Sequence, residues 1–308
     1  IARLVGSEMC IRDRYLSINN ISLGFHRLSI NDLSDAGNQP MKLNNYFLIC
    51  NGEIFNHKKI IEDYNFKMNS DSDCEVILHL YDYLIEKISQ ENSNPYNDVI
   101  NILCNKLDGE FSFILYDTMR NYIYIARDPY GVRPLFLGNT SDGDYVFSSE
   151  LKGLNNLVKN AEQFQPGSYM IISNYISESN IELDILENTY HSIQIFNHIA
   201  YNDLITENEI LESLNYFLRE AVYKRMMSDK EICSLLSGGL DSSLVASIVS
   251  EKLGPNKLKT FAIGLKGSPD LKYAKIVADH IKSVHHTIEL TEEEFLNAIE
   301  QVLSLIHI

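Results

Sequence analysis

The sequence predicts an α/β protein with two domains, a layered domain of strands and helices followed by a domain built around a parallel sheet. Three observations lead to this prediction. The chain has 308 residues, which is long for a single hydrophobic core. Strand-like periodicity dominates from about residue 21 to residue 176, whereas helices and strands alternate from about residue 207 onward. Hydrophobic residues make up 45% of the chain, which is ordinary for a folded protein.

The predicted strands of the first half are short and apolar. Residues 46–50 form a candidate buried strand, and residues 144–149 add another. Residues 111–117 and 121–127 flank a short turn, as the two arms of a hairpin do. This half is therefore predicted to be a β-rich layered domain with helices.

One clear helix interrupts these strands, and a linker follows them. Apolar residues recur at helical spacing over 76–88, behind Ser72, a candidate helix cap. Residues 177–206 are polar, acidic and weakly periodic, and we place the linker there. The first domain is accordingly predicted over 15–190 and the second over 207–308.

The second half alternates between helices and strands. In order, the sequence predicts a helix over 210–222, a strand at 232–236, a helix around 244–249, a strand at 259–265, a helix over 270–282 and a strand at 286–290. Such alternation favours a parallel sheet with crossover helices.

The composition excludes several classes of function. The net charge of −16 disfavours general nucleic-acid binding, because an acidic surface repels phosphate backbones. The five cysteines are odd in number, scattered and without metal-ligand spacing, which favours a reducing compartment. No apolar run approaches the roughly 20 residues that span a bilayer. With no secretory signal recognised, we expect a cytoplasmic protein without membrane partners.

The strongest local motif is Ser237–Ser243, which lies between a predicted strand and a predicted helix. Gly238 and Gly239 permit a turn whose backbone N–H groups approach an anion, and the helix N-terminus adds partial positive charge. Asp241 either caps the helix or helps to hold Mg²⁺. A glycine turn without a ligand is the alternative, but it does not explain why hydroxyl and carboxyl side chains crowd these positions.

This motif lacks the spacing of a Walker A loop and resembles the Ser-Gly-Gly-x-Asp-Ser signature of ATP pyrophosphatases. Segments 261–265, 267–270 and 284–286 are similar to the asparagine synthetase branch of those enzymes. The resemblance implies an ATP site at Leu236, Ser237, Gly238, Gly239, Asp241, Ser242, Ser243 and Ile263, with Mg²⁺ at Asp241. His285 and His286 invite a metal interpretation, but neighbours on a strand point to opposite faces, which favours structural histidines.

The first half independently resembles the glutaminase domain of the same family, which is of the amino-terminal-nucleophile type. The matching segments are Phe25–Ile30, Asn51–His57, Ser72–Glu75, Leu107–Phe111 and Arg127–Leu135.

The resemblance implies a role for each residue of a glutamine pocket. It implies that Arg27 pairs with the glutamine α-carboxylate, that Glu53 and Asp73 receive the α-ammonium, and that Asn51 and Gly52 donate to the oxyanion. Leu28, Ser29 and Ile30 complete the implied glutamine-binding set. The alternatives are a surface ion pair for Arg27, a hairpin turn at Asn51–Gly52 and a helix cap at Asp73.

Both ends depart from the family pattern. The family's nucleophile is a cysteine at the mature amino terminus, but the residues after Cys10 do not continue that pattern, so no catalytic nucleophile is assigned. Residues 1–14 are predicted to be non-native, and 303–308 are suspected to be so. We expect a fragment, truncated at both ends, that neither hydrolyses glutamine nor makes asparagine.

For the intact parent, the resemblance implies an ATP-dependent carbon–nitrogen ligase with glutamine as amido donor. Ammonia from glutamine would attack a β-aspartyl-AMP formed from aspartate and ATP, giving asparagine, AMP and pyrophosphate. Three alternatives stay open: a β-lactam-synthetase-like amide ligase, an amidophosphoribosyltransferase, and a non-catalytic ligand-binding relative. A homodimer is kept as a candidate assembly.

Overall fold

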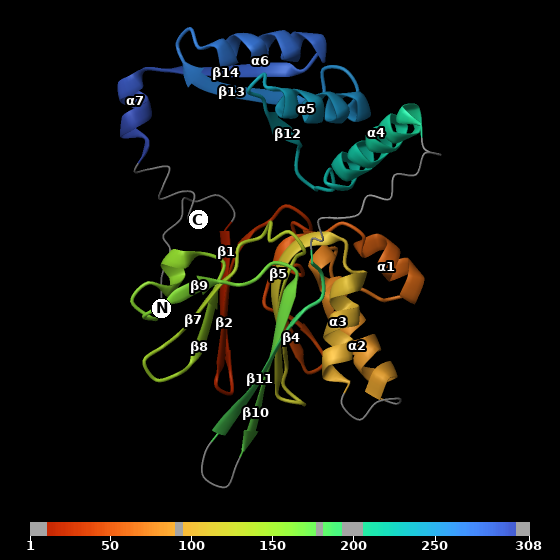
Figure 1. Ribbon diagram of the computed structural model, residues 1–308, viewed down its shortest axis with the longest axis vertical. Helices are drawn as coiled ribbons and strands as arrows, with labels where there is room; N and C mark the ends of the chain where they lie inside the picture. Colours follow the sequence, from red (N-terminus) through yellow and green to blue (C-terminus); the bar gives the residue numbers. More distant parts are fainter. Residues whose placement is uncertain (1–10, 90–94, 177–180, 193–205, 300–308) are drawn as a thin grey trace. The chain divides into compact units, whose positions relative to one another are not determined.

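The computed structural model describes residues 11–89, 95–176, 181–192 and 206–299. Contacts divide the chain into two compact units, 1–196 and 197–308, and each unit is described by itself (Figure 1). Among the helices of the described residues, none has the length and apolar composition needed to cross a membrane. The α/β class predicted from the sequence is confirmed.

The first unit is built on a six-stranded sheet in which every neighbouring pair is antiparallel. In spatial order its strands are β11 (Ile181–Thr189), β10 (Ser168–Ile176), β6 (Tyr122–Arg127), β5 (Gly109–Asp117), β4 (Tyr46–Ile54) and β3 (Met41–Leu43). The predicted hairpin is present, with Asp117 of β5 paired to Tyr122 of β6.

Helices pack against this sheet to form the main core of the first unit. They are α1 (His57–Tyr64), α2 (Val76–Ser89) and α3 (Tyr96–Lys106), and Figure 1 shows them gathered beside β4 and β5. Leu48 and Leu115 of the sheet and Ile77, Leu80 and Val99 of the helices are fully buried in one cluster. The apolar spacing that predicted α2 is thus the spacing of its buried face.

A 3-10 turn, η1 (Asp73–Glu75), precedes α2, and this changes the role predicted for Ser72. Ser72 stands before the turn but its side chain makes no capping hydrogen bond, so the predicted cap is wrong. The turn is instead held by the carboxylate of Glu75, which accepts hydrogen bonds from Asn69 and Ser70 in the preceding loop.

A second layer covers residues of the large sheet that α1–α3 do not. It contains β7 (Phe136–Asn139), β8 (Tyr145–Ser148), β9 (Ala161–Gln163) and the short turn η2 (Leu151–Leu154). Leu135, Leu137 and Phe164 are buried in one cluster with Ile125 of β6 and Met170 of β10. The unit is therefore layered, as predicted.

A separate hairpin joins β1 (Ile11–Ile18) to β2 (Ile21–Leu28). Residues 11–14, which the sequence analysis assigned to a non-native end, pair with residues 25–28 in this hairpin. Residues 1–10 and 303–308 lie outside the described residues.

The linker prediction is wrong over residues 181–189, which form β11. This strand pairs with β10 along its whole length. β11 lies at the edge of the sheet, and its apolar side chains stay largely exposed, for example Leu183 at 43% and Leu186 at 42%. An edge strand needs only backbone pairing on one side, so it can be polar, and its composition then does not indicate a strand. Residues 177–180 and 193–205 lie outside the described residues.

The second unit contains a three-stranded parallel sheet, which confirms the parallel arrangement predicted from the alternation of elements. Its strands, in spatial order, are β12 (Cys233–Leu235), β13 (Lys259–Leu265) and β14 (Val284–Leu290). The helices are α4 (Glu207–Lys224), α5 (Leu240–Leu253), α6 (Pro269–His280) and α7 (Glu292–Asn297).

The core of the second unit lies between its sheet and helices α5 and α6. Ala246 and Val249 of α5 and Ala274 of α6 are buried with Leu258 and Ala262. The predicted apolar stripe of α4 contributes little to this core. Only Val222 of that helix is buried, and the remaining stripe residues are largely exposed, such as Phe217 at 68%.

Candidate functional site

Arg27, the second-last residue of β2, has a buried side chain that organises the loop after the strand. Its Nη1 group donates to Ser34 O and to Asn38 Oδ1, both at 2.9 Å. Its Nη2 group donates to Asn31 O at 3.0 Å and to Asp32 O. With 6% of its surface exposed, Arg27 is not the surface ion pair considered as an alternative.

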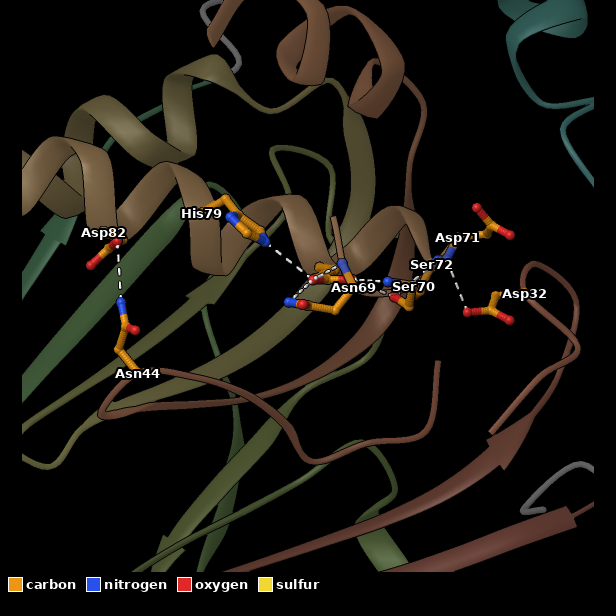
Figure 2. Close-up of polar contacts among 9 residues, drawn as sticks. Asp32, Asn44, Asn69, Ser70, Asp71, Ser72, His79 and Asp82 are labelled. Atoms are coloured by element: carbon orange, nitrogen blue, oxygen red, sulfur yellow. Dashed lines mark hydrogen bonds and ion pairs between the residues drawn. The ribbon is translucent and has the colours of Figure 1, made fainter. Parts of the chain in front are cut away.

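Asp32 connects this loop to the segment before α2. Its Oδ1 atom accepts hydrogen bonds from the Ser34 backbone N–H at 2.9 Å and hydroxyl at 2.5 Å. Its Oδ2 atom accepts from the Asp71 N–H at 3.0 Å, the contact drawn in Figure 2. Burial alone would raise the pKa of Asp32, but these hydrogen bonds and the charge of Arg27 lower it. The carboxylate therefore stays ionised and keeps the two segments together.

Asn51, Gly52 and Glu53 lie within β4 and pair with residues 110–112 of β5. The alternative of a hairpin turn at Asn51–Gly52 is therefore wrong. A Cβ atom on Gly52 would lie 2.3 Å from Glu110 O and 2.6 Å from Phe111 Cα. Glycine is needed here because the backbone of the neighbouring strand fills the space that a side chain would take.

Asp73 joins three segments of the first unit. Its Oδ2 atom accepts a hydrogen bond from the Ile54 N–H at the end of β4, at 2.6 Å. Its Oδ1 atom accepts one from the Asn31 side chain at 3.4 Å. Asp73 is 4% exposed and does not cap α2, so that alternative is also wrong. The loop that surrounds Arg27, the end of β4 and the turn before α2 are thus brought together.

The remaining predicted glutamine-binding residues follow Arg27 directly. Ser29 is buried at 8% exposure, whereas Leu28 and Ile30 expose 67% and 38% of their surfaces. The structure thus places all of the predicted residues on three segments, and hydrogen bonds of Arg27 and Asp73 link these segments.

Sequence reasoning gave no role to Glu75, although it lies in one of the matching segments. Its carboxylate is buried and accepts hydrogen bonds from Asn69, Ser70 and His79. Figure 2 shows Asn69 and Ser70 in the loop before α2 and His79 on the helix itself. Burial would raise the pKa of Glu75, but the contacts with His79, Ser70 and Asn69 lower it from 4.5 to about 2. The only signal in the sequence was an acidic residue directly before the predicted helix.

A rigid turn follows β6 in the Arg127–Leu135 segment. The buried carboxylate of Asp128 accepts from the N–H groups of Tyr130, Val132 and Arg133, each at 3.0 Å, and of Phe111 at 3.3 Å. The last contact lies beside Gly52, because Phe111 is the residue paired with it. This segment therefore fixes β5 next to the predicted oxyanion residues.

In the second unit, Ser237–Ser243 forms the turn between β12 and α5 that the sequence predicts. Gly239 is the N-cap residue of α5, so Asp241 in the first turn is not the cap, and that interpretation is wrong. The Ser237 and Ser242 hydroxyls lie 3.0 Å apart, and the Ser243 hydroxyl donates to Gly239 O at 2.6 Å. An exposed Asp241 and these hydroxyls surround the N-terminus of a 14-residue helix, the kind of place where phosphate binds.

Gly238 brings this loop into contact with α6. Its φ of +79° is unfavourable for other residues, and a Cβ atom would lie 2.5 Å from Ala274 N. Of the other predicted ATP-site residues, Leu236 is buried and its N–H donates to Phe261 O, while Ile263 is 56% exposed. The turn after β12 therefore approaches α6, and the residue before the turn pairs with β13.

The two neighbouring histidines have protein partners. His285 Nδ1 lies 2.9 Å from the Thr260 hydroxyl, and the His286 ring stacks on Phe261 with centroids 5.0 Å apart. Within the described part of the chain, no group of three or more His, Cys, Asp or Glu side chains could hold a metal ion.

Two family models match the chain along nearly its whole length. Residues 12–212 match the glutamine amidotransferase domain, and residues 213–307 match asparagine synthase. The chain is 39% identical over 299 residues to a probable glutamine-hydrolysing asparagine synthetase of Acanthamoeba polyphaga mimivirus, covering 93% of this chain and 51% of that protein. It is 35% identical to the glutamine-hydrolysing asparagine synthetase of Homo sapiens, covering 94% and 53%. The chain thus spans about half the length of these curated relatives.

Two solved structures also share features with the chain. One is described as the allosteric regulatory enzyme of purine biosynthesis, at 14% identity, covering 87% of this chain and 66% of that one. The other is the glutamine phosphoribosylpyrophosphate amidotransferase of B. subtilis, at 16% identity, covering 86% and 66%. Both have a TM-score of 0.43.

Proposed function

Because the chain belongs to the family of glutamine-hydrolysing asparagine synthetases, we propose that its first unit binds glutamine and its second unit binds ATP. The proposed reaction of the whole protein is glutamine-dependent asparagine synthesis. Ammonia from glutamine attacks a β-aspartyl-AMP formed from aspartate and ATP, and asparagine, AMP and pyrophosphate leave. We propose domains at 15–190 and 207–308 for these two roles.

The observation that carries the proposed glutamine site is the convergence of Arg27, Asp73 and the end of β4. A free amino acid presents one carboxylate and one ammonium, so it needs charges of both signs at a short separation. We propose that Arg27 serves the α-carboxylate, that Asp73 and Glu53 serve the α-ammonium, and that Asn51 and Gly52 stabilise the oxyanion.

The contacts of Arg27 set a condition on this proposal. Both of its Nη groups already donate to four oxygens of the loop over 31–38. A two-pronged contact with glutamine then requires some of these oxygens to exchange for the ligand carboxylate. Before that exchange, the Arg27 guanidinium supplies positive charge near the proposed site and holds the loop over 31–38. Asn31 of this loop contacts Asp73.

The ATP site is proposed at the turn between β12 and α5, lined by Leu236, Ile263 and Ser237–Ser243. Backbone N–H groups at the start of α5 suit phosphate, and the Ser237, Ser242 and Ser243 hydroxyls add donors. Mg²⁺ is commonly held by one or two carboxylates together with substrate phosphates, so the single carboxylate of Asp241 fits this role. The metal would offset phosphate charge, and the protein residues would orient the nucleotide.

The proposed surroundings of the protein follow from its composition. The described cysteines Cys50, Cys74, Cys104 and Cys233 are free thiols, which supports a reducing compartment such as the cytoplasm. The net charge of −16 supports small molecules rather than nucleic acids as partners.

Asp73→Asn is expected to weaken glutamine binding by about 30-fold, because it removes a charge-assisted hydrogen bond to the ammonium while preserving shape. Isothermal titration of the chain with L-glutamine measures the effect, and ATP titration of the same sample reports on the second unit. Asp71→Asn is the matched control, since the Asp71 side chain is exposed and only its backbone N–H contacts Asp32. Equal glutamine affinity in the two variants would contradict the proposed site.

Asp241→Asn is expected to separate the effect of Mg²⁺ from that of the phosphate loop. With Mg²⁺ present, the variant should bind ATP about tenfold more weakly than the wild type, because a metal ligand is lost. With EDTA it should bind at least as tightly, because a carboxylate that repels phosphate is gone. Asp270→Asn, an exposed acid in the first turn of α6, is the control. Equal weakening in both buffers would argue against Asp241 as the metal ligand.

A further inference from the structure

We infer that Glu75 is a positioning residue of the proposed glutamine site. Its buried carboxylate anchors the loop over 69–72, and this loop holds Asp32 beside Arg27 and leads directly into Asp73. The inference rests on the proposed function of the first unit, and it adds a residue for which sequence reasoning gave no role.

Five donors converge on this one carboxylate. Oε1 accepts from the Asn69 backbone and side-chain N–H groups, both at 2.9 Å, and lies 3.1 Å from His79 Nε2. Oε2 accepts from the Ser70 N–H at 2.8 Å and hydroxyl at 2.5 Å. The Glu75 side chain is 5% exposed, so water does not compete for these contacts. The carboxylate thus takes the place of water as the hydrogen-bond acceptor for Asn69 and Ser70.

Hydrogen bonds connect the loop over 69–72 to the residues of the proposed pocket. The Ser70 hydroxyl accepts a hydrogen bond from the Ser72 N–H at 3.3 Å, which fixes the residue before Asp73. The Asp71 N–H donates to Asp32 Oδ2 at 3.0 Å, as Figure 2 shows. Arg27 in turn donates to the backbone oxygen of Asp32. A short path of hydrogen bonds therefore leads from Glu75 to the guanidinium.

An ionised carboxylate is the side chain that suits this position. Asn69 and Ser70 present only donors to it, and a carboxylate accepts on both oxygens. Glutamine at this position would direct an NH₂ group toward one set of donors and leave them without an acceptor. The low pKa of Glu75 agrees with this geometry, since it keeps the acceptor form across the neutral range.

The test compares Glu75→Gln with Glu86→Gln in the complete 308-residue chain. Glu86 lies on α2, the helix that follows Glu75, with an exposed side chain, so the two variants share the chemical change but not the environment. Titration with L-glutamine and with ATP measures the two affinities, and hydrogen exchange measures the order of residues 69–73. For Glu75→Gln we expect about tenfold weaker glutamine binding, faster exchange in the loop and unchanged ATP binding. Glu86→Gln should change none of these.

A third variant separates positioning from general stability. Ile77→Val removes a methyl group from a fully buried residue of α2, so it lowers the stability of the unit without changing a residue of the loop. Its glutamine affinity should equal that of the wild type. If Ile77→Val weakens glutamine binding as much as Glu75→Gln does, Glu75 acts only through stability and the inference is overturned.

The remaining outcomes are also decisive. Unchanged glutamine affinity in a folded Glu75→Gln chain overturns the inference. If that variant does not fold, Ser70→Ala takes its place, because it removes one of the five donors and keeps the carboxylate. Ser70→Ala is expected to bind glutamine about threefold more weakly. Unchanged glutamine binding in Ser70→Ala would overturn the inference. If the wild type binds no glutamine, the proposed function fails, and unchanged loop exchange in Glu75→Gln would separately overturn the anchoring role.

Discussion

Gly52→Ala is expected to destabilise the first unit by about 3 kcal/mol or more and to abolish glutamine binding. The new Cβ atom would lie 2.3 Å from Glu110 O and 2.6 Å from Phe111 Cα. Both are backbone atoms of β5, so no side-chain rotation relieves the overlap, and β4 and β5 must move apart. These two strands lie inside the six-stranded sheet and carry much of its core.

Chemical denaturation followed by far-ultraviolet circular dichroism measures this effect, since the chain has no tryptophan. Gly24→Ala is the matched control, because Gly24 also lies in a strand but the nearest atom to its added Cβ is Tyr15 Cδ2 at 4.0 Å. Alanine is at least as favourable as glycine in an open strand position, so the control should be as stable as the wild type. An unfolding midpoint of Gly52→Ala equal to that of Gly24→Ala would refute the close approach of β4 and β5.

Gly238→Ala should have the largest effect in the second unit. Two penalties combine: a φ of +79°, which costs alanine about 1 kcal/mol, and a Cβ atom placed 2.5 Å from Ala274 N. The turn must move away from α6, which carries the hydroxyls of Ser237 and Ser242 away from their positions. We expect ATP affinity to fall by about 100-fold, measured by titration calorimetry.

Gly254→Ala isolates the backbone penalty from the steric one. Gly254 has a φ of +92° at the end of α5, and its added Cβ atom would meet nothing within 4 Å. Its ψ of 165° places it in a backbone region that is essentially restricted to glycine, so this variant should lose about 1–3 kcal/mol of stability and keep the ATP affinity of the wild type. Similar ATP affinities for the two variants would mean that contact with α6 does not shape the phosphate loop.

Except for α7, the strands and helices of the second unit could be predicted because apolar residues recur in them at strand or helix spacing, even in α4, whose apolar stripe is largely exposed. The strand predicted at 259–265 coincides with β13, which is flanked on both sides by other strands. After Lys259 its residues form a continuous run of apolar and β-branched types. β11 was missed for the opposite reason: it pairs through its backbone at a sheet edge and its sequence is rich in acids. Backbone hydrogen bonding leaves little trace in composition.

The residues of the proposed glutamine pocket could be chosen from the sequence, but the contacts among them could not. Motif resemblance identified Arg27, Asp73 and the end of β4, and the structure brings them together. Neither the loop oxygens around Arg27 nor the role of Glu75 was foreseen. An acid in the first turn of a helix ordinarily interacts with that helix's own N–H groups. Only the fold reveals that Glu75 turns back to the preceding loop.

The close approach of Gly238 to α6 also affects how ATP would associate with the proposed nucleotide site. A Cβ atom on Gly238 would lie within 2.6 Å of main-chain atoms of Tyr273 and Ala274, so α6 leaves the turn no room to move toward it. A site of this kind is preorganised: its conformational entropy is lost when the unit folds and not when a ligand arrives. Association with ATP should then follow a single exponential whose rate rises linearly with concentration, without a slower closing phase.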